Sequence, residues 1–121
     1  MKILIAEDDP VMLMLIQHQL TKEDYTISAH LDAREAIQAI ETFQPDLIVT
    51  DIVMPFTSGL ELISIVRSGG IKIPILVLSA MDQETTVLEA LSLGANDFIT
   101  KPFNGSELST RLKKLLSIKK K

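Results

Sequence analysis

The chain has 121 residues, of which 46% are hydrophobic and 23% charged, and this composition is typical of one compact folded domain. A formal net charge of −4 argues against direct nucleic-acid binding, because phosphate backbones attract basic surfaces. The chain has no cysteine, which excludes disulfides and thiolate metal sites, and no apolar run approaches the roughly 20 residues that span a bilayer. We therefore expect residues 1–121 to form one cytoplasmic domain without a membrane partner.

Strand-like apolar runs alternate five times with amphipathic, helix-like stretches, a pattern that predicts an α/β fold. The second run is polar and alternating, which places it at a sheet edge, whereas the fourth is almost wholly apolar and therefore interior. The expected architecture is a (βα)5 three-layer sandwich, in which helices cover both faces of a parallel five-stranded sheet of order 2-1-3-4-5. The predicted strands are residues 2–6, 25–30, 47–51, 73–78 and 97–100.

Helix boundaries are marked by residues with known terminal preferences. Pro10 suits a first helical turn, Asp32 and Asn104 each precede a glutamate at capping-box spacing, and Gly94 ends the fourth helix. The terminal lysines, Lys119 to Lys121 among them, are expected to offset the negative end of the last helix. The predicted buried stripes include Met12, Leu13, Leu15, Ile16 and Leu20 on the first helix and Val87, Leu88 and Leu91 on the fourth.

Polar side chains follow four of the predicted strands. Asp8 and Asp9 come after the first strand, Asp51 ends the third, Ser79 follows the fourth and Lys101 follows the fifth. Right-handed crossovers bring the carboxyl ends of parallel strands to the same edge, so these side chains should meet in one crevice. Three carboxylates there would repel one another unless a cation joins them. A hard divalent ion with oxygen ligands, Mg²⁺ above all, resolves this conflict.

The combination of a metal, a carboxylate, a hydroxyl and an ammonium group suits phosphoryl transfer. Mg²⁺ and Lys101 can neutralise the equatorial oxygens of a phosphoryl group, and Ser79 can donate a hydrogen bond to one of them. A carboxylate oxygen of Asp51 can then attack phosphorus in line, which produces an aspartyl phosphate.

Several short motifs occur together at characteristic intervals. They are Asp8-Asp9, Asp51 followed by Met54-Pro55 and Gly59, Ser79-Ala80, and Lys101-Pro102-Phe103. In this order they resemble, along the whole chain, the response-regulator receiver domain of two-component signalling. The resemblance implies a flavodoxin-like, CheY-like fold and a phosphoacceptor switch that assists its own phosphorylation and dephosphorylation, rather than an enzyme.

The resemblance also implies a role for each site residue. Asp51 would be the phosphoacceptor, and Asp9, Asp51 and the backbone carbonyl of Val53 would hold Mg²⁺. In the same family pattern Asp8 acts on the metal mainly through water. Lys101 would pair with the phosphate and join Pro102 through a cis peptide. Ser79 would be the switch hydroxyl, with Phe98 as the aromatic that turns in response.

The partners implied are a sensor histidine kinase or phosphotransfer protein, a downstream effector, and a second copy in a phosphorylation-dependent homodimer. Such dimers use the face made by the fourth helix, the fifth strand and the fifth helix. Asp97 and Arg111 stand where charge pairs occur on that face, but the fourth helix lacks the basic residue usually paired there.

The lifetime of the phosphoryl group depends on the residues beside the path by which a water molecule would attack it. Val53 and Met81 offer no polar group that could hold an attacking water, so we expect slow autodephosphorylation.

Three other interpretations fit the residues less well. A Mg²⁺-dependent hydrolase with an Asp nucleophile generally needs a second acid two residues later, where this chain has Val53. A flavodoxin-like mononucleotide binder needs a Ser/Thr/Gly-rich loop after the first strand, where this chain has Glu7-Asp8-Asp9. A phosphorylation-independent interaction module would not need the intact set of site residues.

Overall fold

The structure is a computed structural model that describes residues 1–54 and 56–119, with the backbone alone at residues 118 and 119. The expectations for Pro55 and for the charges of Lys119 to Lys121 therefore lie outside the described residues. Within the part described, no helix combines the length and the apolar character that crossing a membrane requires.

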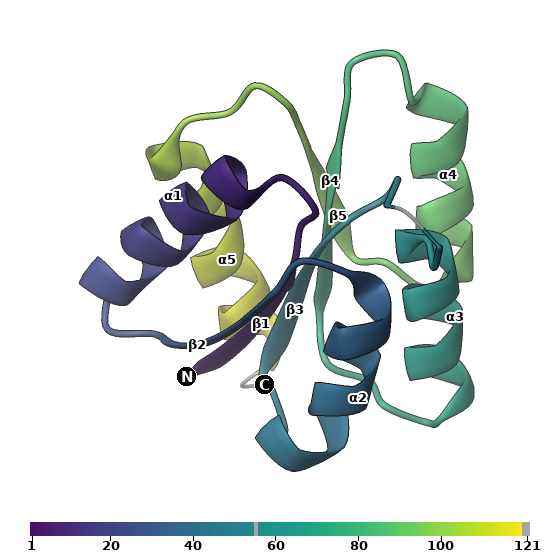
Figure 1. Ribbon diagram of the computed structural model, residues 1–121, viewed down its shortest axis with the longest axis horizontal. Helices are drawn as coiled ribbons and strands as arrows, with labels where there is room; N and C mark the ends of the chain where they lie inside the picture. The colour runs from purple at the N-terminus through teal and green to yellow at the C-terminus, as the bar shows by residue number, and fades with distance from the viewer. Residues whose placement is uncertain (55, 120–121) are drawn as a thin grey trace.

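Strands and helices alternate along the chain as predicted. All five strands are parallel, in the order β2-β1-β3-β4-β5, which confirms the predicted fold class. Figure 1 shows α1 and α5 on one face of the sheet and α2, α3 and α4 on the other. The elements are β1 Lys2–Ala6, α1 Pro10–Lys22, β2 Thr26–His30, α2 Ala33–Phe43, β3 Leu47–Asp51, α3 Gly59–Ser68, β4 Ile75–Ser79, α4 Glu84–Leu93, β5 Asp97–Thr100 and α5 Gly105–Lys119.

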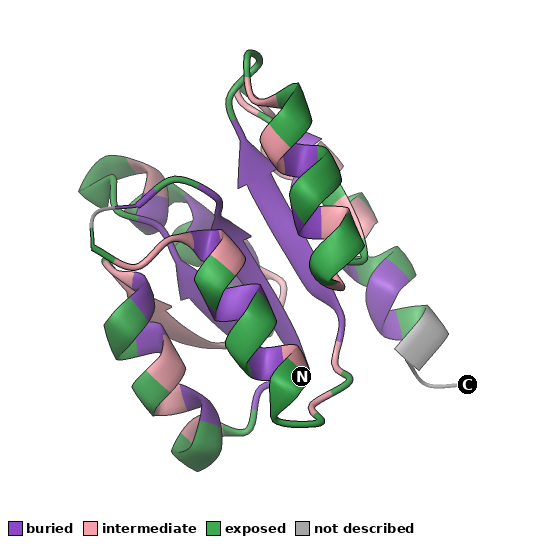
Figure 2. Cartoon of the chain, turned by 90° about the vertical axis from the view of Figure 1, so that its right-hand side faces the viewer, coloured by how far each residue is buried: buried purple, intermediate pink, exposed green. Residues whose placement is uncertain are grey.

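The sheet separates two hydrophobic cores. Alternate residues of one strand point to opposite faces, so Leu4 of β1 packs in the core under α2, α3 and α4, whereas Ile3 packs under α1 and α5. β3 and β4 are buried along their whole length, as expected for central strands (Figure 2). Because the strands are parallel, their carboxyl ends lie together at one edge of this doubly covered sheet.

The structure corrects several details of the sequence prediction. β4 ends at Ser79, which stays in the ladder opposite Thr100, rather than at Leu78. Leu15 and Leu88, predicted in buried stripes, are 58% and 64% exposed. Leu15 follows the buried Leu13 by two positions, about 200° around a helix, and therefore points away from the core.

A glycine allows α3 to begin directly against the end of β3. A Cβ atom on Gly59 would overlap the carbonyl oxygen of Asp51, so no side chain fits at this position. The Gly59 N–H donates to the carbonyl of Ile52 at 2.7 Å. Ser58 caps the helix by accepting a hydrogen bond from the N–H of Glu61. The turn after Asp51 is thus fixed close to the strand end.

Candidate functional site

Asp51 is the last residue of β3, the central strand, with β1 on one side and β4 on the other. The residue is only 7% exposed. Its Oδ1 atom accepts a hydrogen bond from the N–H of Ile52 at 2.9 Å, which orients the carboxylate. The position matches the prediction that Asp51 stands at the carboxyl edge of the sheet, where ligands of such folds bind.

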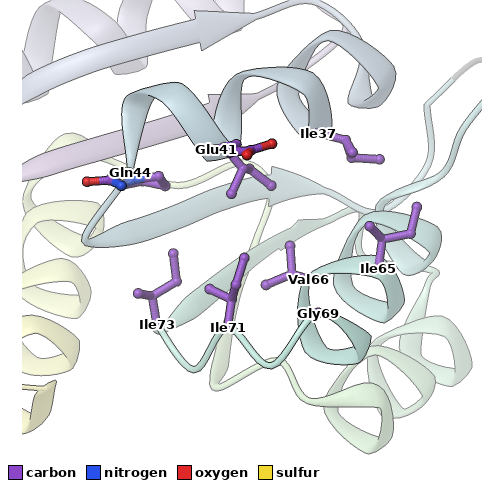
Figure 3. Close-up of a pocket in the computed structure, with 10 residues that line it drawn as sticks. Ile37, Glu41, Gln44, Ile65, Val66, Gly69, Ile71 and Ile73 are labelled. Atoms are coloured by element: carbon purple, nitrogen blue, oxygen red, sulfur yellow. The ribbon is translucent and has the colours of Figure 1, made fainter.

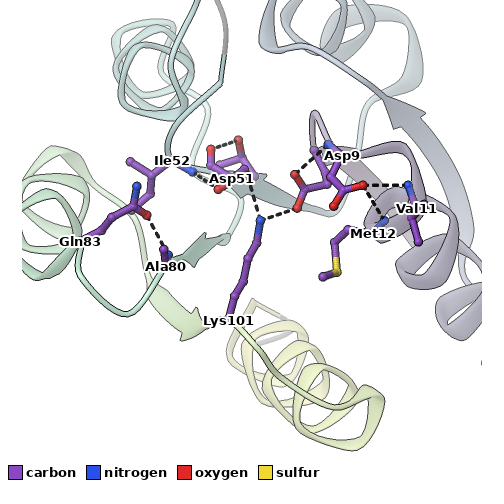
Figure 4. A network of polar contacts seen from close by, with 10 residues as sticks. Asp9, Val11, Met12, Asp51, Ile52, Ala80, Gln83 and Lys101 are labelled. Carbon is purple, nitrogen blue, oxygen red and sulfur yellow. Dashed lines mark hydrogen bonds and ion pairs between the residues drawn. The ribbon is translucent and has the colours of Figure 1, made fainter.

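Lys101 joins two carboxylates at this edge. Its Nζ atom lies 2.9 Å from Oδ2 of Asp51 and 2.7 Å from Oε1 of Glu7, although these residues are far apart in the chain (Figure 4). The Lys101–Pro102 peptide is cis, as the family resemblance implied. The structure therefore brings Lys101 and Asp51 together as predicted.

Three carboxylates gather at the crevice. Oxygen atoms of Glu7, Asp8 and Asp51 all lie within 4.8 Å of one another. Glu7 is fully buried, whereas Asp8 is exposed, so the group opens to solvent on one side. Hard oxygen donors at this spacing, with room for water on the open side, fit Mg²⁺.

The acidic group differs from the sequence prediction by one residue. Asp9 was expected to hold the metal, but it is not among the three clustered acids. Its Oδ1 atom instead accepts hydrogen bonds from the N–H groups of Val11 and Met12, so Asp9 is the N-cap of α1 (Figure 4). The place that we assigned to Asp9 is taken by Glu7, which the prediction left without a role.

Burial and mutual repulsion change the acidity of these groups. Burial, and then the contact with Asp51, raises the pKa of Glu7 above its ordinary value. The pKa of Asp8 is raised by burial and by the neighbouring Glu7. Burial alone would lower the pKa of Lys101, but its hydrogen bonds to Glu7 and Asp51 outweigh that effect and raise the pKa. The carboxylates thus repel one another, and a divalent cation bound between them would reduce this repulsion.

Ser79 ends β4 on the strand next to Asp51, and it is 1% exposed. Its carbonyl oxygen accepts a hydrogen bond from the N–H of Lys101 at 2.7 Å, which ties the ends of β4 and β5 together. Ser79 also lines a hollow of about 360 Å³ under α4, and Phe98 of β5 lines the same hollow while remaining 37% exposed. The two predicted switch residues therefore border one space into which an aromatic ring could turn.

Asp97 and Arg111 form an ion pair within the chain. Nη1 of Arg111 lies 2.9 Å from Oδ1 of Asp97 and also donates to the carbonyl of Phe98. The pair thus links β5 to α5 on the face predicted for output.

Val53 and Met81, predicted to flank the approach to Asp51, are 56% and 79% exposed. Each follows a site residue by two positions, Val53 after Asp51 and Met81 after Ser79. Metal binding by the Val53 carbonyl stays a prediction.

A hollow of about 520 Å³ lies between α2 and α3 (Figure 3). Its lining is mainly aliphatic, with Ile37, Ile65 and Ile73 prominent, and it borders the segments that lead into β3 and β4. It is therefore at the opposite edge of the sheet from Asp51 and contains none of the predicted site residues.

The sequence matches the family model described as the response regulator receiver domain over residues 3–113. It is 37% identical over 115 residues to the alkaline phosphatase synthesis transcriptional regulatory protein PhoP of Bacillus subtilis, covering 95% of this chain and 48% of that protein. It is 41% identical over 119 residues to the transcriptional regulatory protein KdpE of Staphylococcus aureus, covering 98% of this chain and 51% of that protein. The chain thus spans about half the length of these relatives.

Solved structures show the same fold. The receiver domain of the Francisella response regulator 1452 superposes with a TM-score of 0.90 at 33% identity, and the match covers 98% of each chain. NtrX from Brucella abortus superposes with a TM-score of 0.93 at 27% identity, over 98% of this chain and 27% of that one.

Proposed function

Because this chain belongs to the response regulator receiver domain family, we propose that it accepts a phosphoryl group on Asp51. The donor would be the phosphohistidine of a sensor kinase or phosphotransfer protein, or a small acyl phosphate. Residues 1–121 would form one receiver domain that acts in the cytoplasm as a phosphorylation switch rather than as an enzyme.

The observation that carries the proposal is the pairing of Lys101 Nζ with Asp51 Oδ2 at 2.9 Å and with Glu7 Oε1 at 2.7 Å. An ammonium group on the acceptor carboxylate can move to an oxygen of an incoming phosphoryl group and stabilise its charge. The bond from Asp51 oxygen to phosphorus forms as the bond from phosphorus to the donor nitrogen breaks. The leaving imidazole keeps the electron pair of that bond and takes a proton from solvent.

A magnesium ion completes the proposed site. Glu7, Asp8 and Asp51 would hold it, together with the backbone carbonyl of Val53, and it would supply positive charge beside the transferring phosphoryl group. Asp9 is left out of this set because its carboxylate caps α1.

We propose that the output follows from Ser79. Its hydroxyl would hydrogen-bond a phosphoryl oxygen and turn toward Asp51, and the ring of Phe98 would enter the space released under α4. The face formed by α4, β5 and α5 would then contact an effector, as part of the same protein or a separate one. A homodimer on this face would have to accommodate Arg111, which already pairs with Asp97 of its own chain.

Incubation with Mg²⁺ and acetyl phosphate tests the proposal. We expect intact mass to show one phosphoryl group on the wild-type chain and none on Asp51→Asn. Omission of Mg²⁺ should reduce the wild-type signal strongly. Equal incorporation into Asp51→Asn would reject Asp51 as the acceptor.

A further inference from the structure

Gln83 makes a contact that the proposed function does not use. It lies between β4 and α4, at the position immediately before the helix. Its side-chain oxygen Oε1 accepts a hydrogen bond from the backbone N–H of Ala80 at 2.8 Å (Figure 4). Ala80 is exposed and is the first residue after β4.

The N–H of Ala80 is a donor at the same edge as Asp51. Asp51 pairs in register with Leu78 on the neighbouring strand, and adjacent strands lie about 4.8 Å apart. Ala80 follows Leu78 by two residues, so it lies just past Asp51 along the strand direction. The preceding Ser79 is held beside Lys101 by a backbone hydrogen bond of 2.7 Å. A backbone N–H group can donate a charge-assisted hydrogen bond to a phosphoryl oxygen.

The contact also deprives α4 of a cap. Asp9, Asp32 and Ser58 each accept hydrogen bonds from N–H groups in the first turn of α1, α2 and α3. α4 has no side-chain cap of this kind, because Gln83 directs its oxygen backward to Ala80. The first turn of α4 therefore lacks the side-chain cap that stabilises the first turns of α1, α2 and α3. This helix also borders the hollow under Ser79.

We propose that Gln83 is a latch that occupies the Ala80 N–H before phosphorylation and must release it when a phosphoryl oxygen arrives. Release frees both the N–H for the anion and the Gln83 side chain beside the first turn of α4. Gln83 is thus a positioning residue that couples the occupancy of Asp51 to the start of α4. This inference rests on the proposed function.

The first test removes the acceptor while keeping the length of the side chain. In Gln83→Met the Ala80 N–H binds water instead, and the net contribution of one hydrogen bond predicts about two- to ten-fold tighter binding of beryllium fluoride, a phosphoryl mimic, in the presence of Mg²⁺. Amide exchange at Ala80, measured by NMR without the mimic, should become faster. Gln38→Met, the same change at an exposed position of α2, should alter neither quantity.

A second variant keeps an acceptor and reverses the effect. The carboxylate of Gln83→Glu is a stronger acceptor for the Ala80 N–H and repels an incoming anion, so beryllium fluoride should bind several-fold more weakly. Unchanged Ala80 exchange in Gln83→Met, or equal affinity for the mimic in Gln83→Met and wild type, would reject the latch. A wild-type chain that neither binds the mimic nor accepts a phosphoryl group would instead reject the proposed function, and the exchange measurement separates the two failures.

Discussion

Two partly buried cations lie at opposite edges of the sheet, and their partners differ in kind. Lys101 contacts the carboxylates of Glu7 and Asp51 at the carboxyl edge. Arg67, in the last turn of α3, donates instead to uncharged oxygens of the described residues: the carbonyls of Gly94 and Ile71 and the side-chain oxygen of Asn96.

The difference separates a reactive edge from a structural one. Around Lys101 the acids Glu7, Asp8 and Asp51 outnumber the cation, so a second cation is favoured there. Around Arg67 every hydrogen bond to a described residue is accepted by an uncharged oxygen, and burial lowers the pKa of the guanidinium. Gly94, with φ of +122°, ends α4 against this side chain. Arg67 therefore holds α3, α4 and β5 together.

Replacing Lys101 by methionine should give the largest effect. Loss of the only ammonium that contacts Asp51 in the described part of the chain should slow phosphoryl transfer from acetyl phosphate about 100-fold, because one preorganised charge is removed from the site. The rate is measured by intact mass over time. Lys72→Met, at an exposed lysine before β4, should transfer at the wild-type rate. A fast Lys101→Met variant would contradict the importance of this ion pair.

Replacing Arg67 by methionine should show the opposite behaviour. The free energy of unfolding should fall by about 3 kcal/mol, because several carbonyl groups lose their donor at once. Urea denaturation measures this loss. Phosphoryl transfer at a temperature where the variant remains folded should stay within about two-fold of wild type. A loss of transfer as large as in Lys101→Met would erase the distinction between the two edges.

The acidic side of the reactive edge can be divided between two neighbouring residues. Asp8→Asn should weaken Mg²⁺ binding about ten-fold or more, because a ligand oxygen loses its charge. Asp9→Ala should leave Mg²⁺ affinity within about two-fold but lower the free energy of unfolding by about 1 kcal/mol through loss of the α1 cap. Calorimetric titration and urea denaturation distinguish the two. Equal losses of Mg²⁺ affinity would restore Asp9 as a ligand.

The presence of Glu7 rather than Asp9 in the acidic cluster shows how local sequence signals and long-range packing differ. Pro10 was correctly predicted in the first turn of α1, and a first-turn proline makes the preceding residue the N-cap. That signal assigns Asp9 to capping and leaves Glu7 and Asp8 for the crevice. The prediction instead paired the two identical residues and overlooked the strand end, where the N–H of Glu7 still bonds the β2 carbonyl of His30.

The placement of Asp51 and Lys101 at one edge was predictable because parallel topology puts every carboxyl strand end at the same edge, whereas the strand order was implied by the family resemblance. The salt bridge between Lys101 and Glu7 was not, since it depends on side-chain directions over a separation of 94 residues. The Gln83 contact was equally hidden, because a glutamine three residues from Ala80 has no single preferred partner. The sequence pattern therefore predicts where the crevice lies, whereas side-chain packing determines which donors and acceptors meet in it.

The smallest expected effect concerns the exposed rim of the reactive edge. Val53 and Met81 offer no polar group to hold a water in line with a phosphoryl group on Asp51, so the phosphorylated state should decay slowly. Val53→Asn adds an amide that can orient such a water and should speed the loss of radiolabel from the purified chain about ten-fold or less. Val53→Leu, which stays apolar, is the matched control and should decay at the wild-type rate. An unchanged rate in Val53→Asn would mean that something other than the missing polar group sets the lifetime. Arg67→Met should lose radiolabel at the wild-type rate, because Arg67 lies at the edge of the sheet opposite Asp51 and does not contact the path of the attacking water.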